Sequence, residues 1–237
     1  MSRWSNVPWP QIAVEAVAIV GSILLAFAID AWWEEVQDER RQAQLISALV
    51  VDFETTKARL MTSIERADGL VDRSERFLQA VMDDERLPIT ELRHLAGGAL
   101  QKIDFEPSLS AYESAVATAQ IRLIENPGLL EHITDFNRAR DSYELHDRIT
   151  ADIHYTGPMW EVRREVGSLS VLFDDTDSIP RGDPLSEEEY RRHYASPLVT
   201  GAVEAVTTAN SSIAGNLRQM QDAVDKILTE LESLEAE

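Results

Sequence analysis

The stretch IAVEAVAIVGSILLAFAIDAWW, residues 12–33, decides how this chain is built. Its 22 residues are apolar except for Glu15, Ser22 and Asp30. A helix of this length covers about 33 Å, enough to cross a hydrocarbon core of about 30 Å. We therefore predict a single transmembrane helix over residues 12–33, between a short tail (residues 1–11) and a water-exposed domain (residues 34–237).

Tryptophans flank the apolar stretch on both sides. Because indole rings concentrate at membrane–water interfaces, we predict four interfacial anchors: Trp4, Trp9, Trp32 and Trp33. Two alternatives compete with a membrane anchor. A cleaved signal peptide would use Ala26-Phe27-Ala28, but the apolar run continues past that site and Glu15 interrupts it. A buried helix of a soluble domain is disfavoured by the apolar length.

One side of the predicted transmembrane helix carries small and acidic residues at steps of three and four. We predict that this side is a helix–helix seam made by Glu15, Ala18, Gly21, Ser22, Ala26 and Asp30. Small residues let a second helix approach closely, and carboxyls at membrane depth face protein or water. The expected partners are the lipid bilayer and another integral membrane subunit, or a second copy of the chain. Alternatively, Glu15 and Asp30 lie at the headgroup boundary.

Composition narrows the remaining possibilities. The chain has 42 acidic and 22 basic residues and a formal net charge of −20, which excludes nonspecific binding to nucleic acid. It contains no cysteine, which excludes disulfides, thiolate metal sites and cysteine nucleophiles. With only 10 glycines and 9 prolines, the composition favours an all-α chain.

Beyond residue 34, apolar positions at three-four spacing predict that the helix continues to about residue 82 without a break. The predicted rod spans about 70 residues, or about 105 Å. Its mixed charges, among them Asp52, Lys57 and Arg59, predict a solvated face.

The middle of the chain predicts short helices and turns. We expect Thr90 to cap a helix that ends at a turn at Gly97-Gly98, although this glycine pair could instead mark a close backbone approach. Ser108 or Ser110 should cap a helix that runs to Ile124. After a turn at residues 126–128, a second long helix should run to Trp160, kinked or split at Gly157-Pro158. Residues 167–184 predict an irregular acidic loop.

The last segment carries the clearest pattern of the water-exposed part. Residues recur at steps of four and three over five heptads, at Val199, Val203, Val206, Asn210, Ile213, Leu217, Met220, Val224, Ile227, Leu231 and Leu234. This stripe predicts coiled-coil-like packing against the helix at residues 42–82 in an antiparallel bundle, or pairing between two chains. In either case a buried Asn210 would set the register.

A search for chemistry finds no catalytic pattern. The five histidines (His94, His132, His146, His154 and His193) form no H-E-x-x-H or E-x-x-H element, and no phosphate-binding glycine loop is present. His146 fits a packed or hydrogen-bonded core position. We therefore expect no catalytic, cofactor or metal site and no enzyme activity.

Two motifs resemble a known family: GSILLAFAIDAWWEE (residues 21–35) and FEPSLSAYESAVATAQIRLIENPGLLEHITDF (residues 105–136). They look like a family of uncharacterised bacterial single-pass membrane proteins with a domain of unknown function. Its members share an Asn/Asp-x-Trp element, matched by Asp30 and Trp32, and a stretch matched around Tyr112 and by Asn126-Pro127. They usually carry glycine at Ala119 or Gln120 and a more basic flank. The family has no established activity, so the resemblance implies placement and fold; Tyr112 and Asn126-Pro127 fit structural roles.

These observations predict a protein of the bacterial inner membrane with its domain in the periplasm. The side is weakly determined, since Arg3 precedes the span and Arg40 and Arg41 follow it. The expected function is that of a non-catalytic scaffold or accessory subunit of a larger membrane complex. The alternative is an extracytoplasmic sensory or ligand-binding bundle that works with a separate signalling partner.

Overall fold

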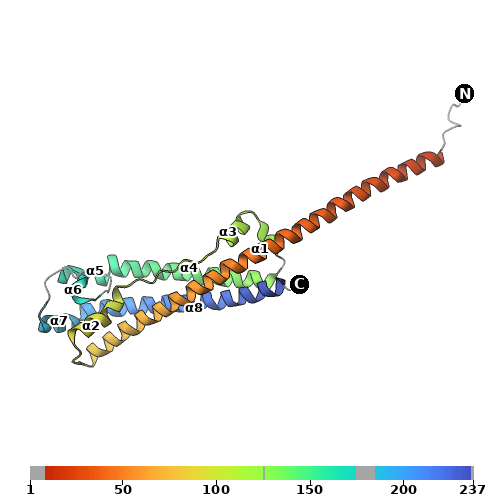
Figure 1. Ribbon diagram of the computed structural model, residues 1–237. Helices are drawn as coiled ribbons and strands as arrows, with labels where there is room; N and C mark the ends of the chain where they lie inside the picture. Colours follow the sequence, from red (N-terminus) through yellow and green to blue (C-terminus); the bar gives the residue numbers. More distant parts are fainter. Residues whose placement is uncertain (1–8, 125, 175–184, 236–237) are drawn as a thin grey trace.

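The computed structural model describes residues 9–124, 126–174 and 185–235 (Figure 1). Within these ranges the secondary structure is helical, and the predicted all-α class is confirmed. The elements are α1 (Trp9–Met82), α2 (Ile89–Ala96), η1 (Gly97–Leu100), α3 (Ser110–Ala117), η2 (Gln120–Leu123), α4 (Pro127–Tyr155), α5 (Pro158–Val166), α6 (Leu169–Leu172), α7 (Glu187–Tyr194) and α8 (Pro197–Glu235).

Helix α1 is one uninterrupted helix of 74 residues, about 111 Å long at 1.5 Å per residue. The predicted continuity from the apolar stretch into the domain is confirmed. Gly69 does not break the helix, because the bundle around it holds the neighbouring turns in place. Figure 1 shows the first half of α1 projecting from the bundle as a free rod, while its second half is part of the bundle.

The bundle consists of α1, α4 and α8. Lys57 of α1 pairs with Asp225 of α8 at 2.6 Å, and Asp68, further along α1, pairs with Arg218, earlier in α8. Asn126 at the start of α4 donates to Glu230 at 2.9 Å, and His146 lies beside Asn216, so α8 runs antiparallel to both other helices. The heptad positions from Val199 to Leu231 are buried, and Leu234 at the end is partly buried. The antiparallel bundle is therefore confirmed. Helix α8 also packs along α4, because small residues beside the heptad stripe widen its buried face: Ala202, Ala209, Ala214 and Ala223.

The predictions for α2 and η1 are wrong in two details. Pro88 occupies the N-cap position and Thr90 lies inside the first turn of α2, since a proline suits a helix start. Gly97 and Gly98 do not form a turn; both are buried in η1. A Cβ on Gly97 would lie 2.0 Å from the carbonyl oxygen of Asp174, and one on Gly98 would lie 2.9 Å from that of Leu70. The pair marks a close backbone approach.

Helix α3 is also shorter than predicted. Its N-cap residue is Leu109, and neither Ser108 nor Ser110 caps it, because both hydroxyls bond Asp52 of α1. The helix ends at Ala117, and Ala119 adopts a left-handed conformation with φ of 59° before η2 begins. That conformation cannot continue an α-helix, so the predicted run to Ile124 is interrupted.

Helices α4 and α7 follow local capping signals. Asn126 caps α4 by accepting a hydrogen bond from the backbone N–H of Leu129, and Pro127 is the first helical residue. The predicted split at Gly157-Pro158 separates α4 from α5. Helix α7 was not predicted, although Ser186 and Glu189 form a capping box before it. Most of the predicted acidic loop, residues 175–184, lies outside the described residues.

Candidate functional site

The apolar half of α1 is uncovered by the rest of the described chain. Val17 is 73% exposed and Phe27 is 67% exposed, and neighbouring apolar residues are similar. The alternative of a buried core helix is therefore wrong. Among the described residues, α1 is the one helix long and apolar enough to cross a membrane, which makes it a candidate for a single span.

The predicted seam lies on the side of α1 that faces away from the bundle core. Ser22 and Ala58 are 36 residues apart, which is ten turns of 3.6 residues, so they share a side of the rod. The same step links the other seam residues to positions outside the core: Glu15 to Val51, Ala18 to Glu54, Gly21 to Lys57, Ala26 to Thr62 and Asp30 to Arg66. By contrast, Val17 lies in line with Phe53, which is fully buried.

The side chains of the seam are exposed along α1. The Ser22 hydroxyl donates to the carbonyl oxygen of Ile19 at 2.8 Å, so this polar group is satisfied within its own helix. Glu15 and Asp30 remain the two ionisable groups of the seam.

Two of the four predicted anchors can be placed. Trp32 and Trp33 are 60% and 51% exposed at the end of the apolar segment, with ring centroids 6.4 Å apart. Trp9 is the first residue of α1, and its side chain is not described; Trp4 lies outside the described residues. The two described rings lie just before Glu34, where an interfacial belt would close a membrane span.

Asp52 holds α3 against α1, and the prediction that it belongs to a solvated face is wrong. It is 5% exposed, and its carboxylate accepts hydrogen bonds from the backbone N–H groups of Ala111 at 2.7 Å and Tyr112 at 3.4 Å. The start of α3 is thus capped by a carboxylate from another helix. Asp52 comes three residues after the buried Leu49 and directly before the buried Phe53, a sequence signal that it lies at the edge of the core.

Tyr112, Asn126 and Pro127, three of the residues on which the family resemblance depends, make structural contacts. Tyr112 is half-buried near the start of α3, and its phenol oxygen accepts a hydrogen bond from Asn137 at 3.2 Å. Asn126 and Pro127 form the start of α4. This end of the bundle is the one from which α1 leaves toward the apolar segment (Figure 1).

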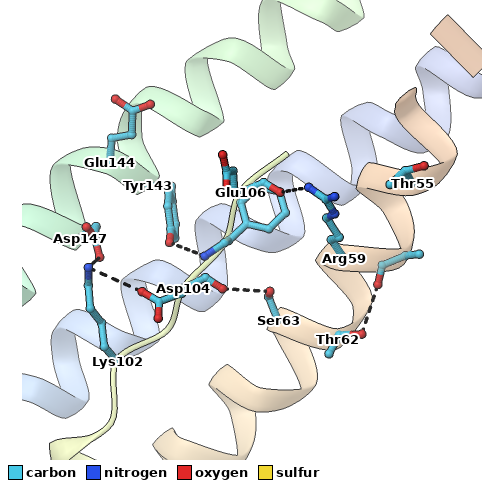
Figure 2. A pocket seen from close by; sticks show the side chains of 12 residues that line it. Thr55, Arg59, Thr62, Ser63, Lys102, Asp104, Glu106, Tyr143, Glu144 and Asp147 are labelled. Atoms are coloured by element: carbon cyan, nitrogen blue, oxygen red, sulfur yellow. Dashed lines mark hydrogen bonds and ion pairs between the residues drawn. The ribbon is translucent and has the colours of Figure 1, made fainter. Parts of the chain in front are cut away.

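A surface groove of about 1040 Å³ lies between α1, the extended segment 101–109 and α4 (Figure 2). Its charged side chains are mostly paired: Lys102 lies 3.0 Å from Asp147, and Arg59 donates to the carbonyl oxygen of Glu106 at 3.0 Å. The pairing with Asp147 raises the pKa of Lys102. Arg59 is exposed, as expected for a solvated face, and its guanidinium also ties the extended segment to α1.

Tyr143 fastens the same segment from the α4 side (Figure 2). Its phenol oxygen accepts from the N–H of Phe105 at 2.9 Å and donates to the carbonyl oxygen of Ile103 at 3.1 Å. Burial raises the pKa of Tyr143 to about 12. With one hydrogen bond accepted and one donated, the phenol is a two-point clamp on the extended segment. Sequence reasoning missed this role, because the clamp joins residues about 40 positions apart.

The histidines do not gather into a site. His146 fits the predicted core role: its Nδ1 lies 2.8 Å from the Ser142 carbonyl oxygen and 3.1 Å from Asn216 Nδ2. Burial is the main cause of the lowered pKa of His154. Within the described ranges, no group of three or more His, Asp or Glu side chains is placed to hold a metal ion.

The groove and the seam are thus two surface features of the described residues that a ligand or partner could use. Comparison of the chain with protein-family models, curated proteins and solved structures returned no match.

Proposed function

We propose that this protein is a membrane-anchored, non-catalytic accessory subunit that docks onto a larger membrane protein complex through α1 and its helical bundle. The observation that carries the proposal is the direction of the seam. The small and acidic side of α1 is exposed from Glu15 to Asp30, so a partner helix can pack along it there, before the same side reaches Lys57, which pairs with Asp225 of α8.

The continuity of α1 also supports this function. A helix of 74 residues without a proline kink transmits position from the membrane to the bundle as one rigid element. Trp33 and Leu45, the first buried residue of the bundle, are 12 residues apart, so the bundle stands about 18 Å beyond the apolar segment. That spacing leaves room beside α1 for the water-exposed parts of a partner.

The test is the size of the assembly in a mild detergent. We expect the native protein to co-migrate with other membrane proteins, and both Ala18→Leu and Glu15→Leu to shift it to a smaller species. Val20→Leu is the matched control, because Val20 is in line with the buried Thr56, on the other side of α1. A native protein that runs as a monomer in its micelle, or seam variants that assemble like the control, would contradict the proposal.

We further propose that the membrane is the bacterial inner membrane and that the bundle lies in the periplasm. Because the chain has no cysteine, Glu75→Cys gives a single labelling site on the exposed face of α1. A membrane-impermeant maleimide should label it in cells whose outer membrane has been opened. Labelling only after lysis would place the bundle in the cytoplasm.

The groove in Figure 2 favours a second function, a ligand-binding or sensory bundle that works with a separate signalling partner. Such a ligand would raise the unfolding temperature of the native protein but not of Ala58→Trp, since Ala58 lines the groove and a larger side chain would fill it. A panel of small molecules that stabilises neither protein would remove the support for this function.

A further inference from the structure

The bundle contains two separate apolar cores. The proximal core, on the side from which α1 leaves, includes Leu49, Phe53, Phe136 and Leu217. The distal core includes Phe77, Met159, Tyr194 and Val203, contributed by α1, α5, α7 and α8. The two cores share no residue, although α1 and α8 run through both.

Buried polar side chains occupy the level between the two cores. Ser74, Thr150 and Asn210 are fully buried, and Thr207 is nearly so. We name these four residues the polar waist. They come from α1, α4 and α8, so each of the three long helices places a polar residue there.

The register of the helices brings Ser74 and Asn210 to the same level. Asp68 of α1 pairs with Arg218 of antiparallel α8. Ser74 lies six residues beyond Asp68 along α1, and position 212 lies six residues before Arg218 along α8. Asn210 is two residues from position 212, which is about half a helical turn along the axis, so it lies near the level of Ser74.

Two members of the polar waist, Thr150 and Thr207, are hydrogen-bonded, and the other two, Ser74 and Asn210, have polar atoms without a partner in the described chain. Thr150 donates to the carbonyl oxygen of His146 at 2.9 Å, and Thr207 to that of Val203 at 2.8 Å. The Oγ of Ser74 and both polar atoms of the Asn210 amide have no hydrogen-bond partner within the described chain. Buried polar groups in native proteins are satisfied, commonly by internal water that makes about three hydrogen bonds.

We propose that the polar waist binds buried water between Ser74 and Asn210, and that it divides the bundle into two halves that open separately. Water satisfies the hydroxyl and both ends of the amide. Continuous apolar packing couples the parts of a bundle into one opening unit, and at this level buried polar side chains interrupt that packing. The polar waist lies wholly within the bundle and does not depend on what the seam of α1 contacts.

Asn216 provides a matched comparison on the same helix. It is also buried, but its Nδ2 lies within hydrogen-bond distance of Nδ1 of His146, at 3.1 Å. Asn210→Leu removes a side chain that only water satisfies and joins the two apolar cores. Asn216→Leu removes a side chain that has a protein neighbour, and it leaves the partly buried His146 ring without the amide beside it.

The experiment is hydrogen exchange of the full chain in detergent micelles at increasing urea, read by mass spectrometry. In the native protein, amides of the distal half should exchange through an opening that needs less urea than the opening of the proximal half. Asn210→Leu should raise the protection of distal amides at least tenfold and make both halves open together. Asn216→Leu should lower protection. A single common opening in the native protein, or loss of protection in Asn210→Leu, would overturn the proposal.

The shared water is tested by a double-variant cycle. If Ser74 and Asn210 bind the same water, the effect of Ser74→Ala on distal protection should differ at least fivefold between the native and the Asn210→Leu backgrounds, because the water is already lost in the second. Effects that agree within twofold in the two backgrounds would show that the two side chains share no water.

Discussion

Replacement of Asp52 by alanine should detach α3 from α1. The carboxylate is almost fully buried and receives hydrogen bonds from two backbone N–H groups of α3 and from the hydroxyls of Ser108 and Ser110. Its short bond to Ala111, at 2.7 Å, is the strongest of the four. The variant would leave the first turn of α3 without an acceptor for these donors.

The expected loss can be estimated from its parts. Loss of an N-cap side chain costs about 0.5–2 kcal/mol, and an unsatisfied buried donor costs about 1–3 kcal/mol. Because these two costs describe overlapping bonds, we expect Asp52→Ala to lower the free energy of unfolding by about 2–4 kcal/mol. Asp52→Asn keeps an oxygen that can accept from Ala111 and should lose about 1 kcal/mol.

The assay is urea unfolding of the full chain in micelles, followed by circular dichroism. Glu54→Ala is the control, because Glu54 is an exposed acid of the same helix. An Asp52→Ala variant within about 0.5 kcal/mol of this control, the usual range of surface substitutions, would refute the reasoning that Asp52 caps α3.

Two further predictions concern glycines and pH. Gly69→Ala should raise the free energy of unfolding by about 1 kcal/mol, since no atom lies within 4 Å of the added Cβ, whereas Gly97→Ala should lower it by about 2–3 kcal/mol, because its Cβ would strike the backbone of Asp174. Equal effects in urea unfolding would contradict both. Burial, together with the positive charges of Arg163 and Lys102, lowers the pKa of His154 below 6.5. Below that pH the unfolded chain therefore binds a proton at His154 more readily than the folded chain does. Stability should therefore fall as the pH drops below about 6.5, and less in His154→Gln; parallel pH profiles would contradict this.

The sequence predicted the large elements of the fold well. The continuous α1, the heptad stripe of α8 and the split at Gly157-Pro158 all follow from spacing within a few residues. Prediction failed where a side chain that is distant in the sequence caps a helix in place of a neighbouring side chain. Ser108 and Ser110 have the right residue type for an N-cap, but the carboxylate of Asp52, more than 50 residues away, takes that role.

In the candidate site too, features set by local spacing could be read from the sequence, and contacts between distant segments could not. Residues of the seam were selected from the sequence, because small and acidic side chains repeat at helical spacing, and their contact with a partner helix stays a prediction. The clamp that Tyr143 makes in the groove could not be predicted from the sequence, since a tyrosine on a half-apolar helix face does not indicate which distant segment its hydroxyl will bind. Gly97 and Gly98 were assigned to a turn for a similar reason: only the position of Asp174 and Leu70 reveals why a side chain is excluded there.

By itself, the sequence determined that the chain has an apolar helix long enough to be a candidate membrane span, that this helix continues into the bundle, and that a heptad stripe is buried against it. These properties depend on hydrophobic periodicity, which is set by residues three or four positions apart. Tertiary structure alone decided that the seam faces away from the core, that Asp52 caps α3 and that a polar waist separates two apolar cores. Each of these depends on how helices far apart in the chain are aligned, and local periodicity carries no information about that alignment.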